Sequence, residues 1–86
     1  LNLRSVTAAT RVLVIGGGEG GEGVVRDMLR DGTYLPIGIV DDDPRLARAR
    51  IHGVPVLGGI DDLADIVRRR DTDIIIIAIP SASGAQ

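Results

Sequence analysis

Residues 11–23 read RVLVIGGGEGGEG, a short apolar run that breaks abruptly into glycines. The unbroken apolar residues 12–15 predict a β-strand buried on both faces. Gly16, Gly18 and Gly21 fit the pattern G-x-G-x-x-G, and apolar residues then recur at helical spacing. A strand, this glycine pattern and a helix, in that order, predict the phosphate-binding turn of a dinucleotide fold, where free N–H groups at the helix start meet the phosphates.

An acidic residue stands where a ribose ligand is expected. Asp41 lies 41 − 21 = 20 positions after Gly21 and closes the apolar run 37–40. A carboxylate at the end of the second strand can accept hydrogen bonds from a ribose diol. Glu19 and Glu22 leave two interpretations open. Facing a pyrophosphate at 4 Å, each would oppose binding by about 4 kcal/mol, whereas beside the helix N-terminus each would stabilise the helix. A glycine turn kept for packing alone is the alternative to a binding site.

Composition limits the other functions. The 86 residues allow one domain, and a net charge of −2 gives no electrostatic footprint for nucleic acid. The absence of cysteine excludes disulfides, thiolate metal sites and thiol nucleophiles. One histidine, His52, cannot form a histidine cluster, and its place between a strand and a turn is typical of a surface or partner-packed residue rather than a catalytic one. We predict no metal site. No run approaches the 18 apolar residues of a membrane span, and no signal peptide is visible.

The pattern along the chain predicts an α/β, Rossmann-like parallel sheet with helices on both faces. Residues 1–10 read as a linker and residues 11–86 as a truncated nucleotide-binding domain from a larger protein. Right-handed crossovers predict the strand order 3-2-1-4. The four parallel strands are expected near residues 11–15, 36–41, 54–57 and 73–79.

The acidic run Asp41-Asp42-Asp43 has one further interpretation besides the ribose ligand at its first position. Asp43 can cap a short helical segment over residues 45–50, which makes the later carboxylates part of a solvated turn. Arg45 can lie on the surface or reach an adenosine phosphate. We assign to the candidate nucleotide-binding site Gly16, Gly18, Glu19, Gly20, Gly21, Asp41, Asp42 and Arg45.

The last strand is apolar throughout. Residues 74–79 read IIIIAI, a composition typical of a central strand covered on both faces. In the order 3-2-1-4 this strand lies at the sheet edge, where unpaired N–H and C=O groups are a template for association. The sequence therefore predicts self-association through this edge.

Four segments, GGGEGGEGVVRDML, GIVDDDP, HGVPVLGGIDDL and DIIIIAIPSASG, together resemble one protein family. It is the N-terminal nucleotide-binding domain of the bacterial CapD-like polysaccharide biosynthesis proteins, nucleoside-diphosphate-sugar 4,6-dehydratases and epimerases. A similar domain occurs in some initiating sugar-phosphate transferases. The resemblance runs from Arg11 to the C-terminus and is most specific between VDDDP and HGVPVLG. Its matching site positions are Gly16, Gly18, Gly21 and Asp41.

The resemblance implies NAD(P) or a sugar nucleotide as ligand. It also implies a parent enzyme with transmembrane helices before this domain and a catalytic domain after it, placed at the cytoplasmic face of the inner membrane. This chain itself is expected to be cytoplasmic, without membrane contact. Short-chain dehydratases of this kind use a Tyr-x-x-x-Lys pair for proton transfer. The chain has no Lys, and Gly38 follows Tyr34 at that spacing, so we predict no catalytic residue and no turnover.

Three functions follow as hypotheses. The first is a non-catalytic domain that binds NAD, with NADP as the second choice, or a sugar nucleotide, in a dehydratase or epimerase of capsule or exopolysaccharide synthesis. The second is a domain that senses NADH or CoA, similar to redox-sensing repressors or CoA-binding domains. The third is a Rossmann scaffold that serves assembly only.

Overall fold

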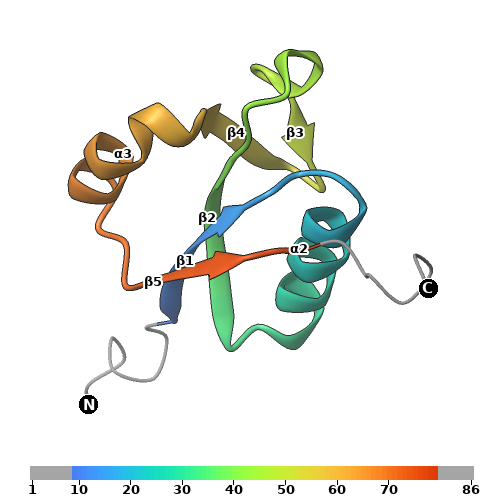
Figure 1. Ribbon diagram of the computed structural model, residues 1–86. Coiled ribbons are helices and arrows are strands. Elements are labelled where there is room, and N and C mark those ends of the chain that lie inside the picture. The colour runs from blue at the N-terminus through green and yellow to red at the C-terminus, as the bar shows by residue number, and fades with distance from the viewer. Residues whose placement is uncertain (1–8, 80–86) are drawn as a thin grey trace.

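The structure is a computed structural model that describes residues 9–79. Figure 1 shows one sheet flanked by helices. The elements in chain order are β1 (Thr10–Ile15), α2 (Glu19–Asp31), β2 (Tyr34–Val40), the 3-10 turn η1 (Pro44–Leu46), β3 (Arg50–Ile51), β4 (Val54–Gly58), the 3-10 turn η2 (Ile60–Asp62), α3 (Leu63–Arg69) and β5 (Ile74–Ile77). The expected linker falls outside the described residues up to position 8, and Thr10 already belongs to β1.

The strand order is β3-β4-β2-β1-β5. β1 pairs in parallel with β2 and with β5, and β2 pairs in parallel with β4. The four predicted parallel strands and their order 3-2-1-4 are therefore confirmed, as right-handed crossovers require.

A short antiparallel strand, β3, was not predicted. It pairs Arg50 with Pro55 and Ile51 with Val54, so the sheet is mixed. The turn between the two strands is His52-Gly53, and both residues have positive φ, 52° and 83°. Such two-residue hairpin turns usually carry Asn-Gly or Asp-Gly. A strand of two residues is too short to show the alternation of apolar and polar residues from which a strand is predicted, and its turn lacks the usual hairpin residues.

The continuous apolar run of β1 is buried on both faces, as expected. Val12 and Val14 belong to one core cluster with Val25 of α2. Leu13 belongs to a second cluster with Ile66 of α3. The two helices lie on opposite sides of the sheet (Figure 1).

Local end signals place most boundaries. Gly32 follows α2 with φ of 82°, the left-handed conformation that ends many helices. Asp43 caps η1 by accepting a hydrogen bond from the Arg45 N–H at 2.9 Å, as predicted. The helical segment is a single turn and does not continue to residue 50, because Arg48 has φ of 64° and residues 50–51 join the sheet.

β5 lies at the edge of the sheet, as its place in the order predicts. It is shorter than expected, and Ile77 and Ile79 are 65% and 76% exposed. Within residues 9–79, no helix combines the length and the apolar character needed to cross a membrane.

Candidate functional site

The candidate site lies where β1, β2 and β4 end. The N–H of Gly16 donates to the carbonyl of Val40 at 2.8 Å, and the N–H of Asp41 donates to the carbonyl of Gly58 at 2.9 Å. These two bonds join the glycine turn, the acidic turn and the end of β4 at one edge of the sheet. In open parallel sheets this carboxyl edge is where ligands bind.

The first and third glycines of the motif are required by the packing of the chain itself. Gly16 has φ of 105°, and a Cβ there would lie 2.9 Å from the carbonyl oxygen of Ala78. A Cβ on Gly21 would lie 1.6 Å from the carbonyl oxygen of Gly16. The start of α2 thus packs directly on the turn, and no side chain fits between them.

The second glycine, Gly18, differs. Its φ is −75°, a value that any residue adopts, and within residues 9–79 an added Cβ would meet no atom beyond its chain neighbours within 4 Å. Gly18 is the N-cap of α2, and in the described part of the chain no side chain caps this end of the helix. Glu19 and Gly20 follow in the first turn of the helix. The Cβ position of Gly18, next to the first free N–H groups of α2, is therefore left unfilled by the described residues.

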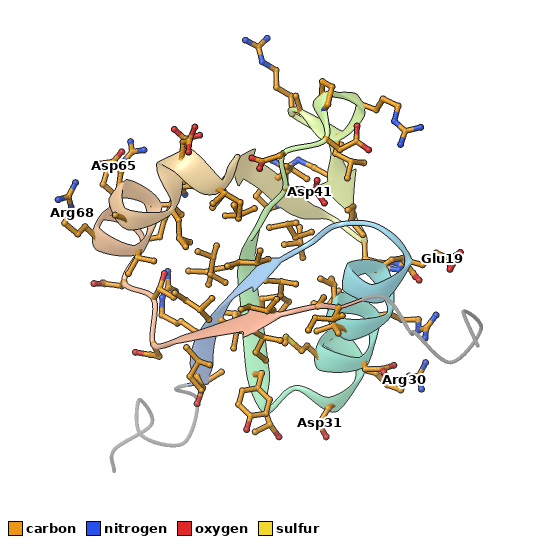
Figure 2. The ribbon with its side chains drawn as sticks, in the orientation of Figure 1. Glu19, Arg30, Asp31, Asp41, Asp65 and Arg68 are labelled. Carbon is orange, nitrogen blue, oxygen red and sulfur yellow. The ribbon has the colours of Figure 1, made fainter. Side chains whose placement is uncertain are left out.

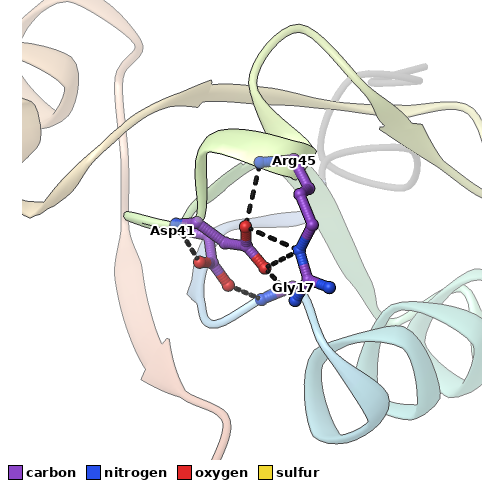
Figure 3. A network of polar contacts seen from close by, with 4 residues as sticks. Gly17, Asp41 and Arg45 are labelled. Carbon is purple, nitrogen blue, oxygen red and sulfur yellow. Dashed lines mark hydrogen bonds and ion pairs between the residues drawn. The ribbon is translucent and has the colours of Figure 1, made fainter.

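Asp41 holds the glycine turn. Its Oδ2 accepts a hydrogen bond from the Gly17 N–H at 2.6 Å, and its Oδ1 accepts one from the Asp43 N–H at 2.8 Å (Figure 3). A carboxylate offers about four acceptor positions, so each oxygen retains one for a further donor. The link between Asp41 and Gly17 spans 24 residues, and no local signal in the sequence predicts it.

The other two carboxylates of the acidic run, those of Asp42 and Asp43, each accept a hydrogen bond from a backbone N–H group. Asp42 Oδ1 accepts from the Ile60 N–H at 2.7 Å and so fixes the start of η2. Asp43 binds the Arg45 guanidinium at 2.8 Å, and this hydrogen bonding lowers the pKa of the Asp43 carboxyl below its ordinary value. The Arg45 side chain is 87% exposed and turned to its own cap residue. The capped-turn interpretation therefore describes these residues, and Arg45 takes no part in the pocket next to them.

A pocket of about 300 Å³ lies between the acidic turn and the end of β4. Its volume is at the lower end of the range for small-molecule sites. The glycine turn does not line the pocket. Asp41 does, and it accepts a hydrogen bond from the Gly17 N–H of that turn. Sequence analysis missed Arg48, which lines the pocket in place of Arg45 because its left-handed φ could not be anticipated. The lining consists of Asp41, Asp42, Asp43, Pro44, Ala47, Arg48, Val56, Leu57, Gly58 and Gly59.

The orientation of the two glutamates, left open by the sequence, is defined in the structure. Glu19 projects outward from the start of α2 and is exposed (Figure 2). Glu22 turns sideways, and its Oε2 lies 2.5 Å from Nε2 of His52 at the tip of the β3–β4 hairpin. This hydrogen bond lowers the pKa of the Glu22 carboxyl. His52 is therefore both exposed and paired with the helix, within the expectation of a surface or partner-packed residue.

Known proteins share this architecture and sequence. The CoA-binding domain family matches residues 2–86. The chain belongs to this family. It is 38% identical over 76 residues to the probable polysaccharide biosynthesis protein EpsC of Bacillus subtilis (strain 168), across 86% of the chain and 13% of EpsC. It is 39% identical over 74 residues to the capsular polysaccharide biosynthesis protein CapD of Staphylococcus aureus, across 83% of the chain and 12% of CapD. The CapD-like resemblance is confirmed, and the chain spans only a small part of these relatives.

Solved structures of nucleotide-dependent proteins have the same fold. The UDP-D-quinovosamine 4-dehydrogenase of Vibrio fischeri matches with a TM-score of 0.74 and 28% identity, over 88% of this chain and 62% of that one. RSP, a Rex-family repressor, in complex with β-NADH matches with a TM-score of 0.72 and 26% identity, over 88% and 37%. The fold is thus that of Rossmann-like nucleotide-binding domains.

Proposed function

We propose that this domain binds a nucleotide through its diphosphate and catalyses no reaction itself. The observation that carries the proposal is the contrast inside the glycine motif. Gly16 and Gly21 are explained by their contacts, whereas an added Cβ at Gly18, at the N-terminus of a 13-residue helix, would meet no other part of residues 9–79 within 4 Å. A diphosphate approaching the backbone there accounts for a glycine that packing does not require.

The proposed ligand extends from the glycine turn to the pocket. Its diphosphate lies against the first N–H groups of α2, and its ribose hydroxyls donate to the acceptor positions that Asp41 retains. The base enters the pocket beyond, where Val56 and Leu57 supply apolar surface and Gly58 and Gly59 bring the backbone close.

The ligand class is NAD or a sugar nucleotide. NADH is bound by RSP, and a UDP-sugar is named as the substrate of the quinovosamine dehydrogenase. Both relatives in sequence are polysaccharide biosynthesis proteins. We therefore place the domain in a protein of capsule or exopolysaccharide synthesis, as a dehydratase or epimerase module that holds a nucleotide. The one tyrosine, Tyr34, begins β2, at the opposite end of that strand from Asp41, which suits a non-catalytic role.

Calorimetric titration of the 86-residue chain with NAD, UDP-glucose and CoA tests the proposal. We expect saturable binding of NAD or UDP-glucose, with amide shifts at residues 17–19 and 41–43 in a parallel NMR titration. Gly18→Val should weaken binding by about thirtyfold or more and keep the fold. Gly23→Ala, on the same helix, should keep both the binding and the fold, since its added Cβ would lie 3.7 Å from the Arg26 side chain, an ordinary contact. No shift with any ligand would leave the scaffold hypothesis in place of this one.

A sensing domain is the second candidate, and the structure of RSP with β-NADH favours it. A sensor of redox state must discriminate NADH from NAD, and a CoA sensor must bind CoA more tightly than either. The same titration extended to NADH separates these cases. A preference for NADH of tenfold or more would support sensing, whereas equal affinities would support simple nucleotide binding.

A further inference from the structure

The β3–β4 hairpin packs against the glycine turn. A Cβ added to Gly17 would lie 3.1 Å from Cδ1 of Ile51 in β3 and 3.1 Å from Cδ1 of Leu46 in η1. At the tip of this hairpin His52 has φ of 52°, next to Gly53 at 83°. A positive φ is uncommon for a residue with a side chain and persists only where the surroundings hold it. The chain thus places a histidine where glycine or asparagine would be less strained.

The His52 side chain contacts the helix that carries the candidate phosphate site. Its Nε2 lies 2.5 Å from Oε2 of Glu22, and the two side chains are 39% and 40% exposed. The N–H of Glu22 donates to the carbonyl of Gly18 at 2.8 Å. The pair therefore lies one helical turn from the open position at Gly18.

Few other charges face this pair in the described part of the chain. From α2, Arg26 lies 3.6 Å from Glu22, and Asp27 lies 3.6 Å from Arg26. From β3, Arg50 donates to the carbonyl of Gly53 at 3.0 Å. Arginine and carboxylate side chains keep their charge near neutral pH, whereas histidine is the side chain whose charge can change there. His52 is the one histidine of the sequence.

We propose that His52 is a positioning residue that joins the hairpin to the first turn of α2 and sets, by its protonation, the charge beside a diphosphate at Gly18. The inference rests on the proposed function, because a diphosphate ligand is what would sense this charge. With His52 protonated, its charge cancels that of Glu22. With His52 neutral, Glu22 presents one negative charge toward the ligand. Binding of a diphosphate is therefore tighter at acidic pH.

The binding test compares NAD affinity at pH 5.5 and 7.2, because the diphosphate of NAD does not titrate between them. We expect the wild type to bind about threefold to fivefold more tightly at pH 5.5, as for one charge at several ångström near a surface. His52→Asn keeps a side chain that tolerates positive φ and should bind at both pH values as weakly as the wild type at 7.2. Glu22→Gln should bind at both as tightly as the wild type at 5.5 or more so.

The two variants separate charge from mere support. Loss of a purely mechanical contact would weaken binding in both, whereas the proposed role moves them in opposite directions. A wild type without pH dependence, or a Glu22→Gln variant that binds more weakly at pH 5.5 than the wild type, would overturn the inference. Arg26→Gln is the matched control on α2 and should keep the wild-type pH profile.

A ligand-free measurement distinguishes failure of this inference from failure of the proposed function. If NAD and UDP-glucose both fail to bind, the proposed function is wrong, and NMR of the free chain decides the role of the pair. The Gly18 amide shift should titrate together with the His52 ring in the wild type and should stop doing so in Glu22→Gln. The pKa of the Glu22 carboxyl should rise toward its ordinary value in His52→Asn. Independence of the two titrations would overturn the inference.

Discussion

The glycine motif contains two kinds of constraint, one at Gly16 and Gly21 and another at Gly18. The outer glycines are enclosed by the chain: one has φ of 105°, and the other would place a Cβ 1.6 Å from a carbonyl oxygen. The middle glycine has an ordinary φ, and within residues 9–79 its added Cβ would meet no other part of the chain within 4 Å. Contacts within the chain explain the outer pair, and under the proposed function a diphosphate explains the middle one.

The contrast separates what a Rossmann-like fold needs from what a nucleotide site needs. A scaffold that had lost its ligand would retain glycines at positions 16 and 21 and would be free to change position 18. Variants at these and other positions test whether a residue is required by contacts within the chain or by a binding partner.

Gly21→Ala should have the largest effect. Because the added Cβ would overlap the Gly16 carbonyl at 1.6 Å, α2 must shift away from the turn, and we expect a loss of about 3 kcal/mol or more in the free energy of unfolding. Chemical denaturation followed by circular dichroism measures it. Gly23→Ala is the control, and should stabilise the helix by about 0.5–1 kcal/mol. A Gly21→Ala variant as stable as the wild type would show that packing does not require glycine at position 21.

Gly18→Val tests whether a ligand approaches the backbone at position 18. We expect the free energy of unfolding to fall by only about 1 kcal/mol, since valine is a poorer N-cap than glycine but its Cβ would meet no other part of residues 9–79 within 4 Å. The NAD affinity should fall by about thirtyfold or more, equivalent to about 2 kcal/mol, because the side chain occupies the approach to the helix N–H groups. Calorimetry at a fixed salt concentration measures the affinity. Unchanged affinity together with an unchanged fold would mean that the ligand does not approach Gly18.

The parts of the fold that sequence predicted are those with a local physical cause. The apolar run of β1 and the cap at Asp43 each depend on neighbouring residues, and each is confirmed. β3 was missed because its two residues gain their partners only when the His52-Gly53 turn closes.

The candidate site was predictable where the motif itself specifies geometry. The glycine turn lies at the carboxyl edge beside Asp41, as the spacing predicts. The pairing of Glu22 with His52 joins residues 30 apart, and the place of Arg48 in the pocket depends on a positive φ. Neither has a signal in a single sequence, because each arises from tertiary contacts.

The two edges of the sheet also differ from each other. One edge ends in the short strand β3, whereas the other presents β5, where Ile75 and Ile77 are 42% and 65% exposed. Burial of two isoleucines is worth about 3–6 kcal/mol before the entropy of association is subtracted. We predict that the chain self-associates through β5. Sedimentation should show association of the wild type and its loss in an Ile75→Lys, Ile77→Lys variant.

Leu29→Lys is the matched control for this edge, because Leu29 is 46% exposed on α2 and lies away from β5 in the sequence. It should leave the association unchanged. A wild type that sediments as a monomer at high concentration would contradict the prediction, and equal effects of both changes would assign the association to general surface hydrophobicity.

The smallest effect concerns the choice between NAD and NADP, and it tests whether the open site continues to Asp41. A 2′-phosphate on a ribose at this carboxylate would meet the charges of Asp41 and Asp42, at a cost on the order of 1–4 kcal/mol. Arg45 cannot offset them without leaving Asp43, to which it is bound at 2.8 Å. We expect NAD to bind about tenfold more tightly than NADP at low salt, where screening is weak. Asp41→Asn should reduce this ratio, whereas Asp27→Asn, on the exposed side of α2, should keep it. Equal or tighter binding of NADP by the wild type would place the ribose elsewhere, and the pocket beside Asp41 would then need a different occupant.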